Sequence, residues 1–127
     1  MIRRFLPDRS GATAAEFALV VPVYILIVLG LIQAGMFFWA NAGLKNGVGE
    51  GARLASLYPR KDDAAIVARI RGSAFGIAAA DLTTPILTHG KSGKVDYVDI
   101  SVSYRGKLVL FNVPAITMTE TQRVYRP

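Results

Sequence analysis

The stretch Gly11-Ala-Thr-Ala-Ala-Glu16-Phe17 and the apolar run behind it determine how this chain is organised. From Phe17 to Leu44 there are 28 consecutive residues without Lys, Arg, Asp or Glu. At ~1.5 Å per residue a helix of this length reaches about 42 Å, more than the ~30 Å hydrocarbon core of a bilayer. Trp39 lies near the far end, where amphipathic rings favour the lipid–water interface. We therefore predict a membrane span at about residues 17–40.

Glu16 places a carboxylate within the first turns of this predicted helix. A charged side chain is costly in a membrane segment, so an embedded acid is normally retained because it meets a partner. Glu16 follows Gly11 by five residues, and the residues before Gly11 include Arg3, Arg4 and Arg9. A basic leader, a glycine, four residues, a glutamate and a long apolar helix thus occur in that order.

This order resembles the class III signal of type IV pilins and pseudopilins. The longer stretch Arg9-Ser-Gly-Ala-Thr-Ala-Ala-Glu16-Phe-Ala-Leu-Val-Val-Pro22 is similar to the pattern of the TadE-like family of Tad (Flp) pilus pseudopilins. Glu50-Gly-Ala-Arg53 also resembles the Glu-Gly-Ala-Arg signature of that family. Phe17 stands where major Flp pilins usually carry Tyr, which favours a minor subunit.

The resemblance implies a structural subunit that helps assemble a Tad pilus for adherence and biofilm formation. It implies prepilin peptidase cleavage between Gly11 and Ala12, and pairing of Glu16 with the new N-terminus of a subunit during assembly. The partners it implies are the prepilin peptidase, other Tad pseudopilins, the major pilin, the inner-membrane assembly platform and membrane lipid.

The three leader arginines, opposed by Asp8, predict a cytoplasmic N-terminus under the positive-inside rule. We therefore expect a bacterial inner-membrane protein with a periplasmic C-terminal domain, which a pilus could carry to the cell surface. A secretory signal cleaved after Ala40-Asn41-Ala42 is the alternative, but its apolar region would be longer than the usual ~7–15 residues.

Pro22 lies inside the predicted helix and lacks the N–H that would bond the carbonyl of Ala18. It predicts a helix break or kink, unless the membrane simply tolerates the proline. Beyond the membrane the helix is expected to continue to residue 58, with Gly43, Gly47 and Gly51 at four-residue spacing. These glycines predict either a close seam with a partner helix or a flexible stalk.

Within the same extension, Glu50 and Arg53 are three residues apart and are expected to form an ion pair, within one helix or between two. We assign residues 1–11 to the leader, 12–58 to the long helix and 59–127 to an exported domain. Pro59 is expected to end the long helix, because a proline disfavours helix for the residue before it.

The exported domain is expected to be α+β and pilin-like. A second helix, capped by Asp62 or Asp63, has an apolar face that extends to Ile77. From Val95 to Tyr104 polar and apolar residues alternate, which predicts a strand with its apolar face on the even positions. Further strands are expected at 86–88 and 116–125, a short strand or connection at 108–113, a connection over 89–94 and a turn at 105–107. Together they form a small antiparallel sheet on the long helix.

The sequence offers few groups for chemistry. It has no cysteine and one histidine, His89, which we expect in a surface loop, so no metal site and no cofactor is predicted. The net charge of +6 is spread without a basic cluster, which argues against nucleic-acid binding. We predict that the chain is not an enzyme. An anchored envelope adaptor that does not enter a filament is the main alternative function, and an anchored enzyme the lesser one.

Overall fold

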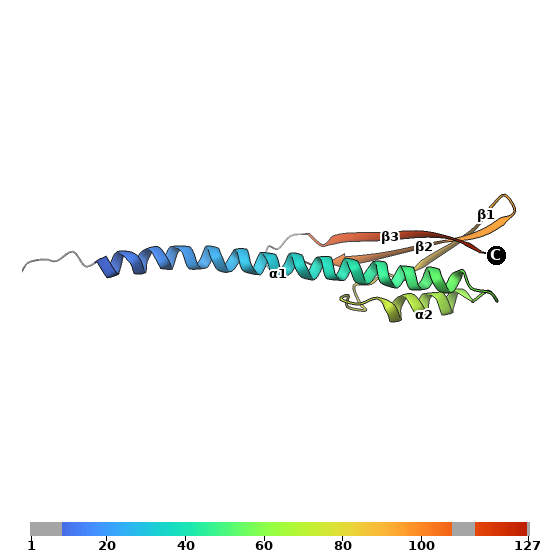
Figure 1. Cartoon of the computed structure of the whole chain (residues 1–127), viewed down its shortest axis with the longest axis horizontal. Helices are drawn as coiled ribbons and strands as arrows, with labels where there is room; N and C mark the ends of the chain where they lie inside the picture. Colours follow the sequence, from blue (N-terminus) through green and yellow to red (C-terminus); the bar gives the residue numbers. More distant parts are fainter. Residues whose placement is uncertain (1–8, 108–113, 127) are drawn as a thin grey trace, which may run out of the picture.

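The computed structural model describes residues 9–107 and 114–126. The elements follow one another as α1 (Arg9–Ala55), α2 (Asp63–Ser73), β1 (Ile86–Ser92), β2 (Val95–Gly106) and β3 (Ile116–Arg126). A long helix, a second helix and a three-stranded antiparallel sheet confirm the predicted α+β class. The first half of α1 projects away from the rest of the molecule, and the second half lies between α2 and the sheet (Figure 1).

Helix α1 ends at Ala55, three residues before the predicted end at residue 58. The backbone N–H of Ser56 still bonds the carbonyl of Ala52, and the N–H of Leu57 bonds Leu54, only three residues back. The helix therefore tightens into a last turn and stops before Tyr58, which Pro59 disfavours in a helix.

Helix α2 is shorter than predicted, because its apolar face was expected to reach Ile77 and the helix ends at Ser73. Asp62 occupies the N-cap position without a side-chain capping bond. After Ala74 the backbone is extended, and Gly76 adopts a φ of +69°, a conformation that glycine adopts without strain. Here the chain passes α1 beside Trp39. This contact, and not helix propensity, explains why α2 ends at Ser73.

The sheet is a meander of order β1-β2-β3 with antiparallel neighbours. The predicted face of β2 is correct, since Val98, Ile100 and Val102 at even positions are fully buried. Strand β1 is longer than predicted and continues through residues that we expected in a loop, because each pairs with β2 down to Ser92 opposite Val95. Gly93 then makes the turn with a φ of +63°.

At its other end, β2 continues to Gly106 and so includes most of the turn predicted at 105–107, because Gly106 pairs with Ile116 of β3. The strand or connection predicted at 108–113 lies outside the described residues. A single cluster of buried side chains joins α1, α2 and the sheet. Its largest fully buried members are Leu44, Val48, Ile66, Ile70, Val98, Ile100 and Val102.

Candidate functional site

The first part of α1 is the candidate site, because it is a long apolar surface that the rest of the described chain leaves largely uncovered. Its end is contacted, since Trp39 lies against Phe75. No residue from Gly11 to Trp39 is buried, and large side chains such as Leu19 and Phe38 are 76% and 69% exposed. Monomeric soluble proteins rarely expose so large a continuous apolar surface. The helix is long and apolar enough to cross a bilayer once, which fits a single-pass membrane anchor.

Gly11, Ala12 and Glu16 lie on the first turns of this helix and are all exposed. Nothing in the described structure lies within 4 Å of a Cβ added to Gly11. The peptide bond between Gly11 and Ala12 is therefore open to an approaching protein, although it is helical and close to a helix end, where helices fray. Among described residues, Glu16 forms no ion pair.

Pro22 does not break the helix. Helix α1 continues through it from Arg9 to Ala55, so the predicted unwound turn is not observed. Pro22 is exposed, so its ring meets no packed neighbour that would bend the chain further. Proline is accepted in membrane helices because the freed carbonyl can be satisfied by local adjustment or by neighbouring helices.

The three glycines at four-residue spacing face α2 and the segment after it. A Cβ on Gly43 would overlap the carbonyl oxygen of Phe75, and a Cβ on Gly47 would lie 2.8 Å from that of Ile70. A Cβ on Gly51 would overlap the Ile70 side chain. The seam therefore lies within one chain, between α1 and its own α2.

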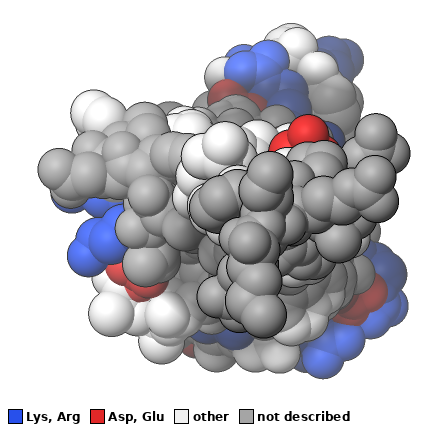
Figure 2. All heavy atoms as spheres, turned by 90° about the vertical axis from the view of Figure 1, so that its left-hand side faces the viewer, with Lys and Arg blue, Asp and Glu red and all other residues white. Residues whose placement is uncertain are grey.

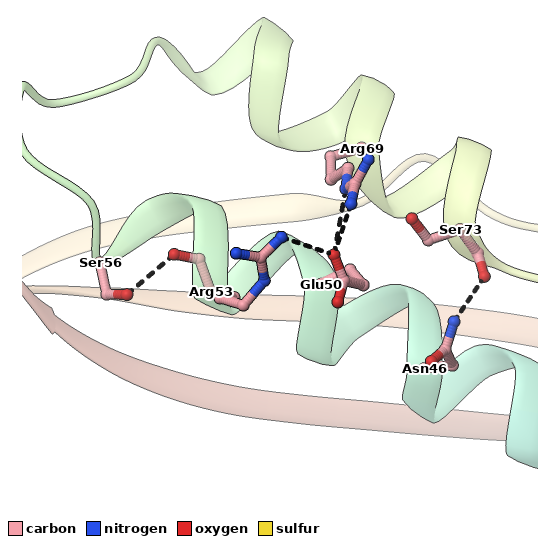
Figure 3. Close-up of polar contacts among 6 residues, drawn as sticks. All are labelled: Asn46, Glu50, Arg53, Ser56, Arg69 and Ser73. Atoms are coloured by element: carbon pink, nitrogen blue, oxygen red, sulfur yellow. Dashed lines mark hydrogen bonds and ion pairs between the residues drawn. The ribbon is translucent and has the colours of Figure 1, made fainter.

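Glu50 is the centre of the polar contacts along this seam (Figure 3). Its carboxylate accepts hydrogen bonds from Arg69 Nη2 at 2.7 Å and from Arg53 Nη2 at 3.2 Å. The arginine bonds, that of Arg69 first, lower the pKa of the Glu50 carboxyl from its ordinary value. Glu50 thus connects its own helix to α2, so the predicted pair with Arg53 is one half of a larger contact.

A second polar contact joins the same two helices one turn earlier. The Asn46 side-chain amide donates to the carbonyl oxygen of Ser73 at 2.9 Å, as Figure 3 shows. Ser73 is the last residue of α2, so this bond satisfies one of the carbonyls that a helix end leaves open. Sequence reasoning missed Asn46 and Arg69, because neither contact is visible without the antiparallel arrangement of α1 and α2.

His89 lies on β1 and not in a loop, so that prediction was wrong. Its Nε2 is 2.8 Å from Oδ2 of Asp63 at the start of α2. Pairing of β1 with β2 through Ser92 carries His89 into the sheet. Within residues 9–107 and 114–126, no group of three or more His, Asp or Glu side chains is placed to hold a metal ion.

The outer face of the sheet carries another feature that the sequence did not reveal. Arg123 of β3 donates to both carboxylate oxygens of Asp99 on β2, at 2.7 and 2.8 Å, and its guanidinium lies 4.1 Å from the ring centre of Tyr97. The bonds from Arg123 lower the pKa of the Asp99 carboxyl. The two residues face one another in the register, so only knowledge of the strand pairing could have found them.

The basic and acidic side chains of the domain lie together in several small groups on its surface. Viewed along α1 from its anchoring end, basic atoms lie around the edge of the molecule, and acidic atoms accompany them (Figure 2). The ion pairs agree with this picture, since Asp96 is bonded by Arg60 and Asp99 by Arg123.

Comparison with known proteins gives a family match for the helical segment. Residues 11–53 match the sequence model of the family described as TadE-like protein. No curated protein and no solved structure matches the chain. The matched range begins at Gly11, ends at Arg53 and so covers almost all of α1, including the exposed anchor and the glycine seam. Over this segment, about a third of its length, the chain is similar to TadE-like proteins.

Proposed function

We propose that this protein is a minor pseudopilin, a structural and non-catalytic subunit that enters a Tad pilus after prepilin peptidase removes residues 1–11. The observation that carries the proposal is the helix at the start of the TadE-like segment: none of its residues from Phe17 to Trp39 is charged or buried, and Glu16 lies at its beginning. Such a helix can leave the bilayer only by packing against similar helices, as it would in a filament.

Cleavage after Gly11 would create a positively charged group that could pair with Glu16. An α-amino group ordinarily has a pKa of ~7.7–8.0, so the new one on Ala12 would be mostly charged at neutral pH. Its position four residues before Glu16 permits contact along the same helix or with a neighbouring subunit. We propose the intermolecular contact, in which an incoming N-terminus neutralises Glu16 of an assembled subunit.

The orientation follows from the same proposal. The leader remains in the cytoplasm, α2 and the sheet fold in the periplasm, and the partners are the peptidase, the other Tad pilins and the assembly platform. A periplasmic location suits the folded domain. Its stability comes from a packed hydrophobic core, and it has no cysteine that would have to be kept reduced or oxidised.

The first experiment is N-terminal sequencing of the protein isolated from cells that contain a Tad system. We expect a mature terminus at Ala12, with the protein still in the membrane fraction because the whole anchor remains attached. In Gly11→Val the side chain obstructs the peptidase, and a full-length precursor should accumulate. An intact Met1 in the wild type would instead support the anchored adaptor, and a soluble form that begins at Gly43 would support a secretory signal.

The second experiment separates processing from assembly. Glu16→Gln should be cleaved and membrane-bound, yet should lose crosslinks to other pilus subunits, since an unmatched buried charge costs ~3–5 kcal/mol. Glu50→Gln removes a carboxylate outside the anchor and serves as the matched control, with crosslinking unchanged. Wild-type crosslinking of Glu16→Gln would contradict the pairing and leave Glu16 as a recognition feature for the peptidase.

A further inference from the structure

The inner face of the sheet changes character at the end farthest from the anchor. Along the core it presents buried valines and isoleucine, but its last row is charged: Lys91, Asp96 and Arg126 lie opposite one another on β1, β2 and β3. Figure 1 shows this end of the sheet, with the β1–β2 turn and the end of β3, on the opposite side of the molecule from the anchoring helix.

Arg126 is the unusual member of this row, because it is only 8% exposed. Among the described residues, its Nε and Nη2 atoms are buried and have no hydrogen-bond partner. The nearest carboxylate oxygen, Oδ1 of Asp63, is 3.9 Å from Nη2, beyond hydrogen-bond distance, and the other oxygen of Asp63 is occupied by His89. Buried guanidinium groups normally satisfy such donors.

Arg123, on the other face of the same strand, shows what these two nitrogens do when a ligand is present. It uses the same pair, Nε and Nη2, to hold both carboxylate oxygens of Asp99 at 2.7 and 2.8 Å. These two N–H groups form the parallel fork that matches a carboxylate or a phosphate. In Arg126 the fork is buried, preformed and without such a partner in the described chain.

Arg126 lines a cavity of about 360 Å³ together with Arg60, His89, Lys91 and Asp96. Three permanent cations and one carboxylate therefore line the cavity, and the carboxylate of Asp63 lies just outside this lining, so the group has an excess of one positive charge. Asp96 does not compensate Arg126, because its oxygens face Arg60 at 2.8 Å and Lys91 at 3.8 Å. The cavity thus combines an excess of positive charge with unfilled donors.

We propose that this cavity binds an oxyanion, a carboxylate or phosphate-type group, through the unpartnered guanidinium of Arg126, with Lys91 and His89 also lining the cavity. The group is either a free anion of the surrounding compartment or an acidic side chain of a protein partner. The site lies far from the anchoring helix, so the headgroups of the membrane that holds the anchor do not reach it.

The test uses the full chain in detergent micelles, labelled with ¹⁵N, titrated with inorganic phosphate against chloride at equal ionic strength. We expect saturable shifts of the Arg126 Nε–H resonance and one bound phosphate per chain by calorimetry. Arg126→Lys keeps the charge but removes the fork and should weaken binding about tenfold or more, since each charge-assisted hydrogen bond contributes substantially.

Arg105→Gln is the matched control, because it removes one positive charge from the opposite end of β2 and should bind phosphate like the wild type. Lys91→Gln, at a side chain 79% exposed, tests the site without disturbing the core and should weaken binding several-fold. Equal binding by Arg126→Lys and wild type would overturn the proposal, and so would the absence of saturable binding of every anion probe to the wild type.

A parallel titration with acetate and with a short acetylated glutamate peptide identifies the source of the group. Binding of phosphate alone supports a free tetrahedral anion. Binding of acetate and the peptide through the same Arg126 resonance supports an acidic side chain of a partner. Failure of all three probes contradicts the site itself, and none of these results depends on whether the protein enters a pilus.

Discussion

The two halves of α1 have opposite surroundings, although the uncharged run extends from the first half into the second. Leu31 is 69% exposed and Leu44, thirteen residues later on the same helix, is 1% exposed. Hydropathy cannot distinguish them, because both lie in the uncharged run from Phe17 to Leu44. The exposed part, which fits a membrane anchor, and the part that packs against the domain belong to one helix. The folded domain begins before the first charged residue that follows the uncharged run, Lys45.

Glycine spacing marks the difference better than hydropathy does. Gly30 and Gly35 in the exposed half would meet nothing within 4 Å if they carried a Cβ, whereas Gly43, Gly47 and Gly51 approach backbone or core atoms. Four-residue spacing keeps the second set on one side of the helix, where α2 packs. Small residues thus identify a protein contact only where they repeat on one face.

The largest effect is expected from a side chain in this seam. In Gly43→Ala the added Cβ would overlap the carbonyl oxygen of Phe75, a backbone atom that cannot move aside without displacing the segment that crosses α1. We expect the domain to lose about 3 kcal/mol of unfolding free energy. The measurement is thermal unfolding of the full chain in micelles, followed by the near-ultraviolet signal of the sheet tyrosines, since the anchor stays helical.

Gly49→Ala is the matched control for that variant. Gly49 lies on the same helix between the seam positions, and nothing is within 4 Å of its added Cβ. The substitution should leave stability unchanged or raise it by up to about 1 kcal/mol through helix propensity. Equal destabilisation by both substitutions would show that the seam is not the cause.

The next effect compares the two halves directly. Leu44→Ala empties a fully buried position of the core and should destabilise the domain by about 2–3 kcal/mol, the lower part of the usual range for a buried leucine. Leu31→Ala makes the same change on the exposed half and should leave the unfolding of the domain unaltered. A similar loss from Leu31→Ala would mean that the anchor contributes to the core of the domain.

Features that depend on interactions between residues close in sequence were predicted, and features that depend on distant residues were not. The long helix, its approximate end at Pro59 and the buried face of β2 depend on local patterns, and each was predicted to within a few residues. The limits of α2 and β1 were not, because the crossing beside Trp39 ends the helix and pairing with β2 extends the strand. Tertiary contacts override local propensity at both places.

The candidate site divides in the same way. Gly11, Ala12 and Glu16 were predicted from the motif, because their relation is one of sequence spacing on a single helix. The bonds of Arg69 to Glu50 and of Arg123 to Asp99 join residues 19 and 24 positions apart, so only the packing of α2 and the register of β3 bring them together. These two ion pairs could therefore not be predicted from the sequence.

The smallest effect is expected from Glu50, the exposed carboxylate that connects the buried half of α1 to α2. Glu50→Gln should lower the unfolding midpoint at neutral pH by less than Leu44→Ala does, because exposed ion pairs contribute little. Lys45→Gln changes a charge on the same helix at a residue that forms no ion pair within the described part of the chain, so it is the control and should have no effect.

The pH dependence of this difference tests its electrostatic origin. Because the bonds from Arg69 and Arg53 lower the pKa of Glu50 below its ordinary value of 4.5, the unfolded state binds the proton first as the pH falls. The carboxylate therefore stabilises the fold above about pH 4.5, and this contribution disappears as the pH falls through the lower folded pKa. Other carboxyl groups titrate in both proteins and cancel in the comparison. The gap between wild type and Glu50→Gln should consequently narrow under acid. A gap that keeps its neutral-pH size after Glu50 is protonated would mean that shape, and not charge, holds α1 against α2.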